Sequence, residues 1–380
     1  MVQKGTDFDI KLEPTAFPHV QIEKRFKQLI QTGALSKGQK IPSLRKLADQ
    51  WGVNFKTVQR AMRHLKEEGI VGGGPRFGMF VKNEIDQAII GVLFIFSPRL
   101  TDEVARFQRA IFESLMTEAE FFDLQKNWTC RAYDGLGNRQ INDSLKQSPS
   151  YRHFLDDLKN YPFKGFVQIH GSFGEDEYSR LCTGLPTVRF GSPHDSRADV
   201  ILDYESFGHD AIRFMAGKGC RRIFYFRTMD DTTCDALDLQ GIRRAEREAG
   251  LPPVEIHQFV YPADLNDLPL VAYESMIRLL DQWEKSGQWP DALLVSDDIV
   301  MSGMAPALIR RRIPWQRSLR TLTMANEGIF HDYGIPIDRY EFSPCDIARN
   351  LTRILKSRLN NETADKWPVK VRGKAVECAG

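Results

Sequence analysis

The stretch IPSLRKLADQWGVNFKTVQRAMRHLKEEGIVGGGPRFGMFVK, residues 41–82, decides how the first part of the chain folds. Pro42 and Ser43 can open a helix, because proline fixes φ and serine caps a first helical turn. Apolar residues at helical spacing continue to Gly52, and a second apolar stripe occupies residues 58–65. This pattern predicts a helix-turn-helix, whose second helix can enter a DNA major groove.

Two short apolar runs follow the second helix and predict a β-hairpin. Ile70-Val71 and Met79-Phe80-Val81 are expected to form strands around the turn at residues 72–78. The turn, GGGPRFG, would form a wing that carries Arg76.

Residues 18–82 resemble the winged helix of the GntR family of bacterial repressors. The resemblance rests on GALSKGQKIPSLRKLA, WGVNFKTVQRAMRHLKEEGIV and the closing GMFV. It implies a DNA-binding domain at residues 1–83. The groove-reading positions that it implies are Ser43, Arg45, Asn54, Phe55, Lys56, Thr57, Gln59 and Arg76.

Three of these positions depart from the family pattern. The family usually has Ser or Thr and then Arg where this chain has Asn54 and Phe55, and Arg where it has Gln59. The operator sequence therefore cannot be transferred from the family. Phe55 leaves two interpretations open, because it could touch a thymine methyl group or pack inward. Arg60 and Arg63, further along the same helix, are expected to contact the DNA backbone or to be solvated.

Composition describes a globular chain with a basic head. The chain has 380 residues, enough for two or three domains. Residues 1–83 hold 15 Lys and Arg against 7 Asp and Glu, a net charge of +8, and the remainder has a net charge of −6. A basic head suits contact with phosphates, although charge blocks can also merely solvate a surface.

Targeting and redox signals favour a cytoplasmic protein. No apolar run is long enough to span a membrane, and the N-terminal segment has no apolar signal region. The six cysteines are scattered, which favours free thiols over disulfides or a metal site.

A short polar segment at residues 84–87 is predicted to be a linker, and the pattern changes beyond it. The continuous apolar run AIIGVLFIF at 88–96 is typical of a strand buried on both faces. Strand and helix patterns then alternate and restart near residue 200, which predicts an α/β domain over 88–380 with two lobes, each a doubly wound parallel sheet. The tail 362–380 is expected to add one weak strand.

The second part of the chain resembles the sugar-binding domain of LacI/GalR-type repressors, which is like a periplasmic binding protein. The resemblance rests on the order and spacing of FKGFVQIH, LPTVRF, VILDYESFG, GCRRI, GIRRAEREAGL and PDALLVSDDIVMSG. A GntR-type head on such a body is similar to arabinose-responsive repressors of the AraR kind. The resemblance implies a homodimer, a double-stranded DNA operator and a small polar effector, expected to be a carbohydrate.

Candidate effector contacts follow strands, because open α/β folds bind ligands at the carboxyl ends of their strands. Asp298 matches a family pattern, and it could instead cap the following helix. Asp238 stands where the family usually has an arginine that grips the sugar, so either it contacts a different ligand or the small-sugar pocket is lost. Arg227 could replace that charge, but is expected to be a surface residue. The full candidate set is Ser97, His170, Asp203, Asp238, Asp298 and Asn326.

Enzyme motifs are missing from the sequence. It contains no P-loop, no G-x-S-x-G and no H-E-x-x-H, and it points to no cofactor and no metal site. We therefore expect a non-enzymatic regulator, most simply a repressor whose operator affinity is controlled by an effector. The alternative is a DNA-binding regulator with a degenerate pocket that responds to a protein partner.

Overall fold

The computed structural model places most of the chain. It describes all residues except 1–16, 32–34, 36–37, 75–77, 83–87, 95–102, 126–127, 134–148, 170–180, 182–183, 194, 230–235, 261–266, 314–318, 330, 363–367 and 379–380. The predicted linker at 84–87 therefore lies outside the described residues.

The chain divides into two compact units. The first contains the head and continues to Ile90, with Gln125–Cys130 and Phe154–Lys164 added from the body. The second contains the rest of the body.

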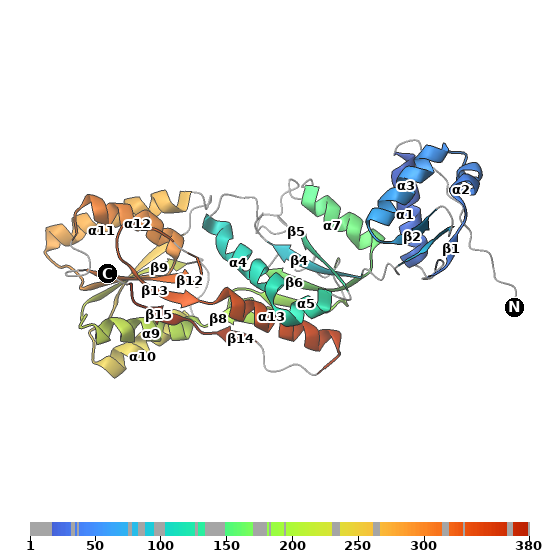
Figure 1. The fold of residues 1–380 in the computed structure, drawn as a ribbon. Coiled ribbons are helices and arrows are strands. Elements are labelled where there is room, and N and C mark those ends of the chain that lie inside the picture. Colours follow the sequence, from blue (N-terminus) through green and yellow to red (C-terminus); the bar gives the residue numbers. More distant parts are fainter. Residues whose placement is uncertain are drawn as a thin grey trace. The chain divides into compact units, whose positions relative to one another are not determined.

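The head is a three-helix winged helix (Figure 1). Its elements are α1 (Pro18–Gln31), β1 (Lys40–Ile41), α2 (Leu44–Trp51), α3 (Phe55–Glu67), β2 (Val71–Gly74) and β3 (Gly78–Val81). The three strands form one sheet in the order β1-β3-β2. The predicted helix pair and hairpin are present, and β1 is an additional strand paired antiparallel with β3. The buried side chains of one core hold these elements together, among them Phe26, Leu47, Val58 and Leu65.

The body contains two six-stranded sheets, which we call the N-lobe and the C-lobe sheets. The N-lobe sheet has the order β14-β8-β7-β6-β4-β5. Its strands are β4 (Ile89–Phe94), β5 (Thr129–Tyr133), β6 (Phe163–Ile169), β7 (Thr187–Phe190), β8 (Val200–Leu202) and β14 (Val369–Val371). Its helices are α4 (Glu103–Thr117), α5 (Ala119–Gln125), α7 (Pro149–Asn160) and α13 (Pro344–Leu359), and α4 lies beside α13.

The C-lobe sheet has the order β10-β9-β11-β12-β13-β15. Its strands are β9 (Ile223–Met229), β10 (Glu255–Val260), β11 (Ala292–Val295), β12 (Arg320–Asn326), β13 (Asp338–Phe342) and β15 (Lys374–Val376). Its helices are α9 (Tyr204–Gly217), α10 (Leu237–Ala249), α11 (Leu268–Ser286) and α12 (Asp298–Arg310). Figure 1 shows α9 and α10 on one face of this sheet and α11 and α12 on the other.

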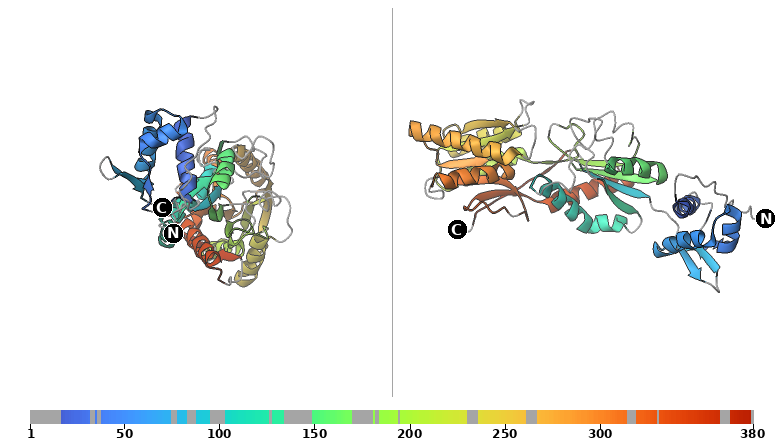
Figure 2. Two further views of the ribbon diagram at one scale, coloured as in Figure 1. Left: turned by 90° about the vertical axis from the view of Figure 1, so that its right-hand side faces the viewer. Right: turned by 90° about the horizontal axis from the view of Figure 1, so that it is seen from above.

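The chain passes between the lobes three times. These crossovers lie between β8 and α9, between β13 and α13, and between β14 and β15 (Figure 2). The pairs β9–β11, β11–β12 and β12–β13 are parallel, and only the edge pair β13–β15 of this sheet is antiparallel. The predicted doubly wound α/β architecture is thus confirmed. Expecting one weak strand in the tail was wrong, because β14 and β15 belong to different sheets.

No described helix is both long and apolar enough to cross a membrane. Cys220 and Cys345, two of the cysteines that the structure describes, are free thiols.

Candidate nucleic-acid interface and effector site

The turn between α2 and α3 fixes how the second helix is presented. Gly52 ends α2 with a φ of 62°, a left-handed conformation that glycine adopts without strain. The next helix begins after Asn54, whose Oδ1 accepts a hydrogen bond from the backbone N–H of Lys56 at 2.8 Å. Ser43 caps α2 in the same way, its Oγ accepting from the N–H of Lys46 at 3.3 Å. Two predicted DNA contacts, Ser43 and Asn54, are therefore also helix caps.

Helix α3 has one face in the core and one face in solvent. Val58, Ala61, Met62 and Leu65 are buried. Asn54, Phe55, Lys56 and Gln59 are exposed, whereas Thr57 is half-buried. Phe55 is 40% exposed, which rules out the inward-packed interpretation.

The positively charged side chains on α2 and α3 differ in whether they already have an ion-pair or hydrogen-bond partner. Within the described part of the chain, Arg45, Lys56 and Arg60 form no ion pair, and all three are exposed. Further along α3, Arg63 lies 3.7 Å from Glu67, and Lys66 Nζ donates to the carbonyl of Gly73 at 2.9 Å. Unpaired charge therefore gathers at the start of α3 and on α2, the part of a helix-turn-helix that meets DNA.

The wing begins as a tight hairpin. Gly73 has a φ of 105°, and a Cβ atom there would lie 1.9 Å from the carbonyl oxygen of Gly78. Only glycine fits this close approach of the two strands. Arg76, the predicted wing contact, lies outside the described residues.

The C-lobe brings two predicted effector residues together at the carboxyl ends of β11 and β12. Asn326 Nδ2 lies 3.4 Å from Asp298 Oδ2, and His331 Nε2 lies 3.4 Å from the same oxygen. The ring of Tyr333 stacks on that of His331 with centroids 5.8 Å apart. We call Asp298, Asn326 and His331 the carboxyl-edge cluster. His331 was missed because it lies five residues beyond the strand end, where no strand pattern marks it.

The capping role considered for Asp298 belongs to its neighbour. Asp297 Oδ1 accepts from the backbone N–H groups of Ile299 at 2.8 Å and Val300 at 3.1 Å. Asp298 is the first residue of α12 and is 8% exposed, and its carboxylate faces Asn326 and His331. Contact between Asp298 and an effector thus stays a prediction, and the alternative that Asp298 caps the helix is removed.

Asp238 lies in a buried ion pair with Arg227. Arg227 Nε donates to Asp238 Oδ2 at 2.6 Å and Nη2 donates to Oδ1 at 3.0 Å, while the hydroxyl of Tyr225 donates to Oδ2 at 2.8 Å. Expecting Arg227 to be a surface residue was wrong, because it is 8% exposed. Burial alone would lower the pKa of Arg227, but the hydrogen bonds and charge of Asp238 outweigh it and raise the pKa.

Tyrosines close to this pair lose acidity. Burial, followed by the charges of Asp297 and Asp238, raises the pKa of Tyr204 to about 12. Burial and the adjacent Asp238 raise the pKa of Tyr225 well above its usual value. Both phenols therefore remain neutral hydrogen-bonding groups.

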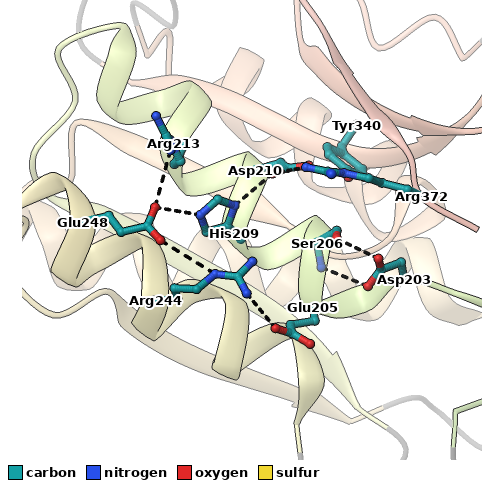
Figure 3. A network of polar contacts seen from close by, with 10 residues as sticks. All are labelled: Asp203, Glu205, Ser206, His209, Asp210, Arg213, Arg244, Glu248, Tyr340 and Arg372. Carbon is teal, nitrogen blue, oxygen red and sulfur yellow. Dashed lines mark hydrogen bonds and ion pairs between the residues drawn. The ribbon is translucent and has the colours of Figure 1, made fainter. Parts of the chain in front are cut away.

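Asp203, predicted to contact an effector, is engaged by its own helix. Its carboxylate accepts from the backbone N–H of Ser206 at 3.1 Å and from the Ser206 hydroxyl at 2.7 Å (Figure 3). Its backbone N–H donates to the carbonyl of Val371 at 2.9 Å, joining the first and third crossovers. Asp203 thus caps α9 and links two crossovers in the segment between the lobes, which we call the hinge. Ser97 and His170, the other two candidates, lie outside the described residues.

A polar network extends from the same hinge along α9, and we call it the hinge network (Figure 3). Asp210 accepts from Arg372 Nη2 at 2.7 Å and from the Tyr340 hydroxyl at 3.2 Å. His209 joins Asp210 and Glu248, each 2.9 Å from one of its ring nitrogens. Burial alone would raise the pKa of Asp210, but hydrogen bonds from His209 and Arg372 hold that pKa below its usual value.

Comparisons with known proteins assign the two parts separately. Residues 18–81 match the description "Bacterial regulatory proteins, gntR family". The uncharacterized HTH-type transcriptional regulator YdeL of Bacillus subtilis is 40% identical over 60 residues, which is 16% of this chain and 13% of that protein. The chain thus spans only a small part of this relative.

The body is similar to solved structures of LacI-type proteins. One is a periplasmic binding protein/LacI transcriptional regulator from Alkaliphilus metalliredigens complexed with D-xylulofuranose, with a TM-score of 0.54, 16% identity and coverage of 77% of this chain and 98% of that one. Another is the lac repressor dimer bound to operator and the anti-inducer ONPF, with a TM-score of 0.56, 13% identity and coverage of 77% and 93%.

At these identities the likeness to the solved structures establishes the fold alone. Residues 18–81 thus form a winged helix-turn-helix that matches the gntR family model, and the rest of the chain has the fold of the solved LacI-type structures.

Proposed function

We propose that this protein is a DNA-binding transcriptional regulator of the cytoplasm, acting as a repressor. The observation that carries the proposal is the solvent face of α2 and α3, where Arg45, Lys56 and Arg60 are exposed without an ion-pair partner in the described chain. Counterion release by such cations drives DNA association, and the exposed start of α3 presents side chains to base edges. The other residues of the proposed contact surface are Ser43, Asn54, Phe55, Thr57, Gln59 and Arg76.

The proposed assembly is a homodimer on a two-fold operator, since two identical heads read a palindrome most simply. The solved lac repressor structure, a dimer bound to operator, supports this arrangement for a body of the same fold. The linker at 84–87 would pass changes in the body to the heads.

The proposed signal is a small polar effector of the carbohydrate class. The carboxyl-edge cluster offers an amide and an imidazole, each 3.4 Å from one carboxylate oxygen, which suits paired hydrogen bonds to hydroxyl groups. It lies at the carboxyl ends of parallel strands, where open α/β folds take ligands. The effector would act by binding one conformation of the body more tightly than the other.

The experiment starts with selection of a binding site from random duplex DNA by the full chain. Thermal unfolding across mono- and disaccharides, sugar acids and sugar phosphates then identifies the effector, because a ligand at about 100 times its Kd adds roughly 2.7 kcal/mol of stability. The effector should change the Kd for the selected site. Asp298→Ala should abolish that response and leave DNA affinity intact, and the surface control Asp281→Ala should change neither. Failure to select any sequence would contradict the proposal.

The buried Arg227–Asp238 pair favours one alternative. Asp238 stands where the resemblance implies a sugar-gripping arginine, and Arg227 is held by Asp238. In this alternative the pocket is degenerate and the body responds to a protein partner. This alternative predicts a selected DNA site but no compound that raises the unfolding midpoint. A sugar that shifts both the midpoint and the DNA affinity would exclude it.

A further inference from the structure

Phe55 is an apolar side chain held in solvent on the helix that the proposed function places in DNA. Among the described residues of α2 and α3, it is the only large apolar side chain more than a third exposed. Phe55 is the first residue of α3, directly after the N-cap Asn54, so the helix and not a loop sets its position. An exposed aromatic ring gains free energy when a partner removes it from water.

Gln59 lies one turn further along the same exposed face. Residues four apart on a helix have neighbouring side chains, with Cβ atoms about 6 Å apart. Gln59 is exposed, and its amide makes no hydrogen bond within the described chain. The start of α3 thus presents an apolar ring and, one turn along, a free amide, with the cation Lys56 between them in sequence.

These two side chains match one kind of base pair. In the major groove, thymine is marked by its C5-methyl group, which apolar side chains contact, and adenine is marked by N7 and N6, which a glutamine amide can bind in bidentate fashion. Guanine presents two acceptors, O6 and N7, which Arg or Lys binds in bidentate fashion; the glutamine carbonyl finds no donor there, and an apolar ring offers none.

We propose that α3 reads A·T pairs: Phe55 contacts a thymine methyl group and Gln59 binds an adenine within one or two base steps of it. This inference rests on the proposed function and adds its sequence preference. Lys56 and Arg60 then supply affinity through phosphates and no sequence information.

The experiment uses the full chain and the sequence selected from random duplex DNA. Each thymine of the half-site is replaced in turn by deoxyuridine, which lacks only the methyl group, and each adenine by 7-deaza-deoxyadenosine, which lacks only the N7 acceptor. For wild type, one deoxyuridine position should weaken binding about fourfold, the effect of exposing one methyl-sized group. One 7-deaza position nearby should weaken binding about tenfold.

Matched variants connect each base atom to its side chain. In Phe55→Ala the deoxyuridine penalty should vanish while the 7-deaza penalty remains, and in Gln59→Ala the reverse should hold. Lys56→Ala should weaken binding to natural and modified sites by the same factor, leaving both penalties intact. The wild-type comparison uses no variant, so it stands even if a substitution disturbs folding.

Two results overturn the inference in distinguishable ways. A selected site with G·C pairs at its core, or an A·T site that tolerates both base analogues, contradicts the reading of A·T pairs and leaves DNA binding itself standing. Selection of no sequence at all overturns the inference together with the proposed function.

Discussion

The head and the body of this protein use their charged residues in opposite ways. In the head, Arg45, Lys56 and Arg60 are exposed and form no ion pair within the described chain. In the body, arginines hold carboxylates that are almost fully buried, as in Arg227–Asp238 and Arg358–Asp199. A buried charge must have a partner, because its desolvation costs several kcal/mol. An exposed charge needs none, so it stays available for a phosphate.

This difference separates charged side chains that stabilise the fold from those available to a ligand, and it does so better than composition. The head's net charge of +8 and the body's net charge of −6 suggest the same division, but charge counts cannot say which side chains are occupied. Lys66 and Arg63 lie on the same helix as Lys56, yet each already has a partner. The contrast yields three predictions, each based on one charged group or set of groups.

The largest effect is expected at the buried pair. Asp238→Ala leaves Arg227 without its carboxylate in a site where both side chains are about 10% exposed, so the body should lose on the order of 3–5 kcal/mol of stability. Thermal unfolding of the full chain should show a midpoint roughly 10 °C lower. Asp281→Ala is the matched control, because Asp281 pairs with Arg311 at the surface and its loss should cost under about 1 kcal/mol. Equal midpoints for both variants would contradict the assignment.

A smaller effect is expected from the unpaired cations. Arg45→Ala, Lys56→Ala and Arg60→Ala should each weaken operator binding by about 1 kcal/mol or more and leave the unfolding midpoint unchanged, since they have no ion pair to lose within the described chain. Arg45→Ala is expected to abolish specific recognition. The slope of log K against log salt concentration should fall by about 0.9 for each phosphate contact removed.

Arg63→Ala is the control for this set, because Arg63 already pairs with Glu67 on the same helix. It should leave the salt slope nearly unchanged. If Arg63→Ala and Lys56→Ala reduce the slope equally, the distinction between paired and unpaired cations does not mark the DNA-facing surface.

The sequence predicted elements well and tertiary partners poorly. The second apolar stripe, predicted at 58–65, is the buried face of α3, because apolar spacing along a helix is a local property. The prediction of one strand in the tail was wrong, because it depended on tertiary structure. VKVRGKAV has the alternation of one strand, but Gly373 lies where a Cβ atom would be 2.4 Å from the ring of Tyr340, and the chain there leaves one sheet for the other. Sequence alternation does not say which sheet a residue joins.

The candidate site shows the same limit. Proximity of Asp298 and Asn326 could be expected, since both lie at the carboxyl ends of strands that are neighbours in a parallel sheet. Burial of Arg227 could not be expected, because an arginine near the end of a strand usually lies in solvent and its partner is 11 residues away along the chain. His331 joins the carboxyl-edge cluster through a loop whose path no periodicity predicts.

The smallest effect is expected at the hinge network, where the charges are partly exposed. The folded-state pKa of Asp210 lies below its usual value, so its ionised form stabilises the folded state at pH above about 4, and this stabilisation is lost as the pH falls through the folded-state pKa. Arg372 is 63% exposed, so solvent screening limits the contribution to about 1 kcal/mol at most. Asp210→Asn should therefore lower the unfolding midpoint by only a few degrees at pH 7.

The pH dependence of that difference tests the cause. Glu248, Glu327 and Glu377 also have lowered pKa values through their own hydrogen bonds, so wild type and variant should both lose stability in acid. The gap between them isolates Asp210, and it should close as the pH falls below about 4 and through the folded-state pKa of Asp210, because protonated Asp210 and asparagine are both neutral. A gap that stays constant over this range would mean that the introduced amide disturbs packing, and that the hinge does not depend on the charge of Asp210.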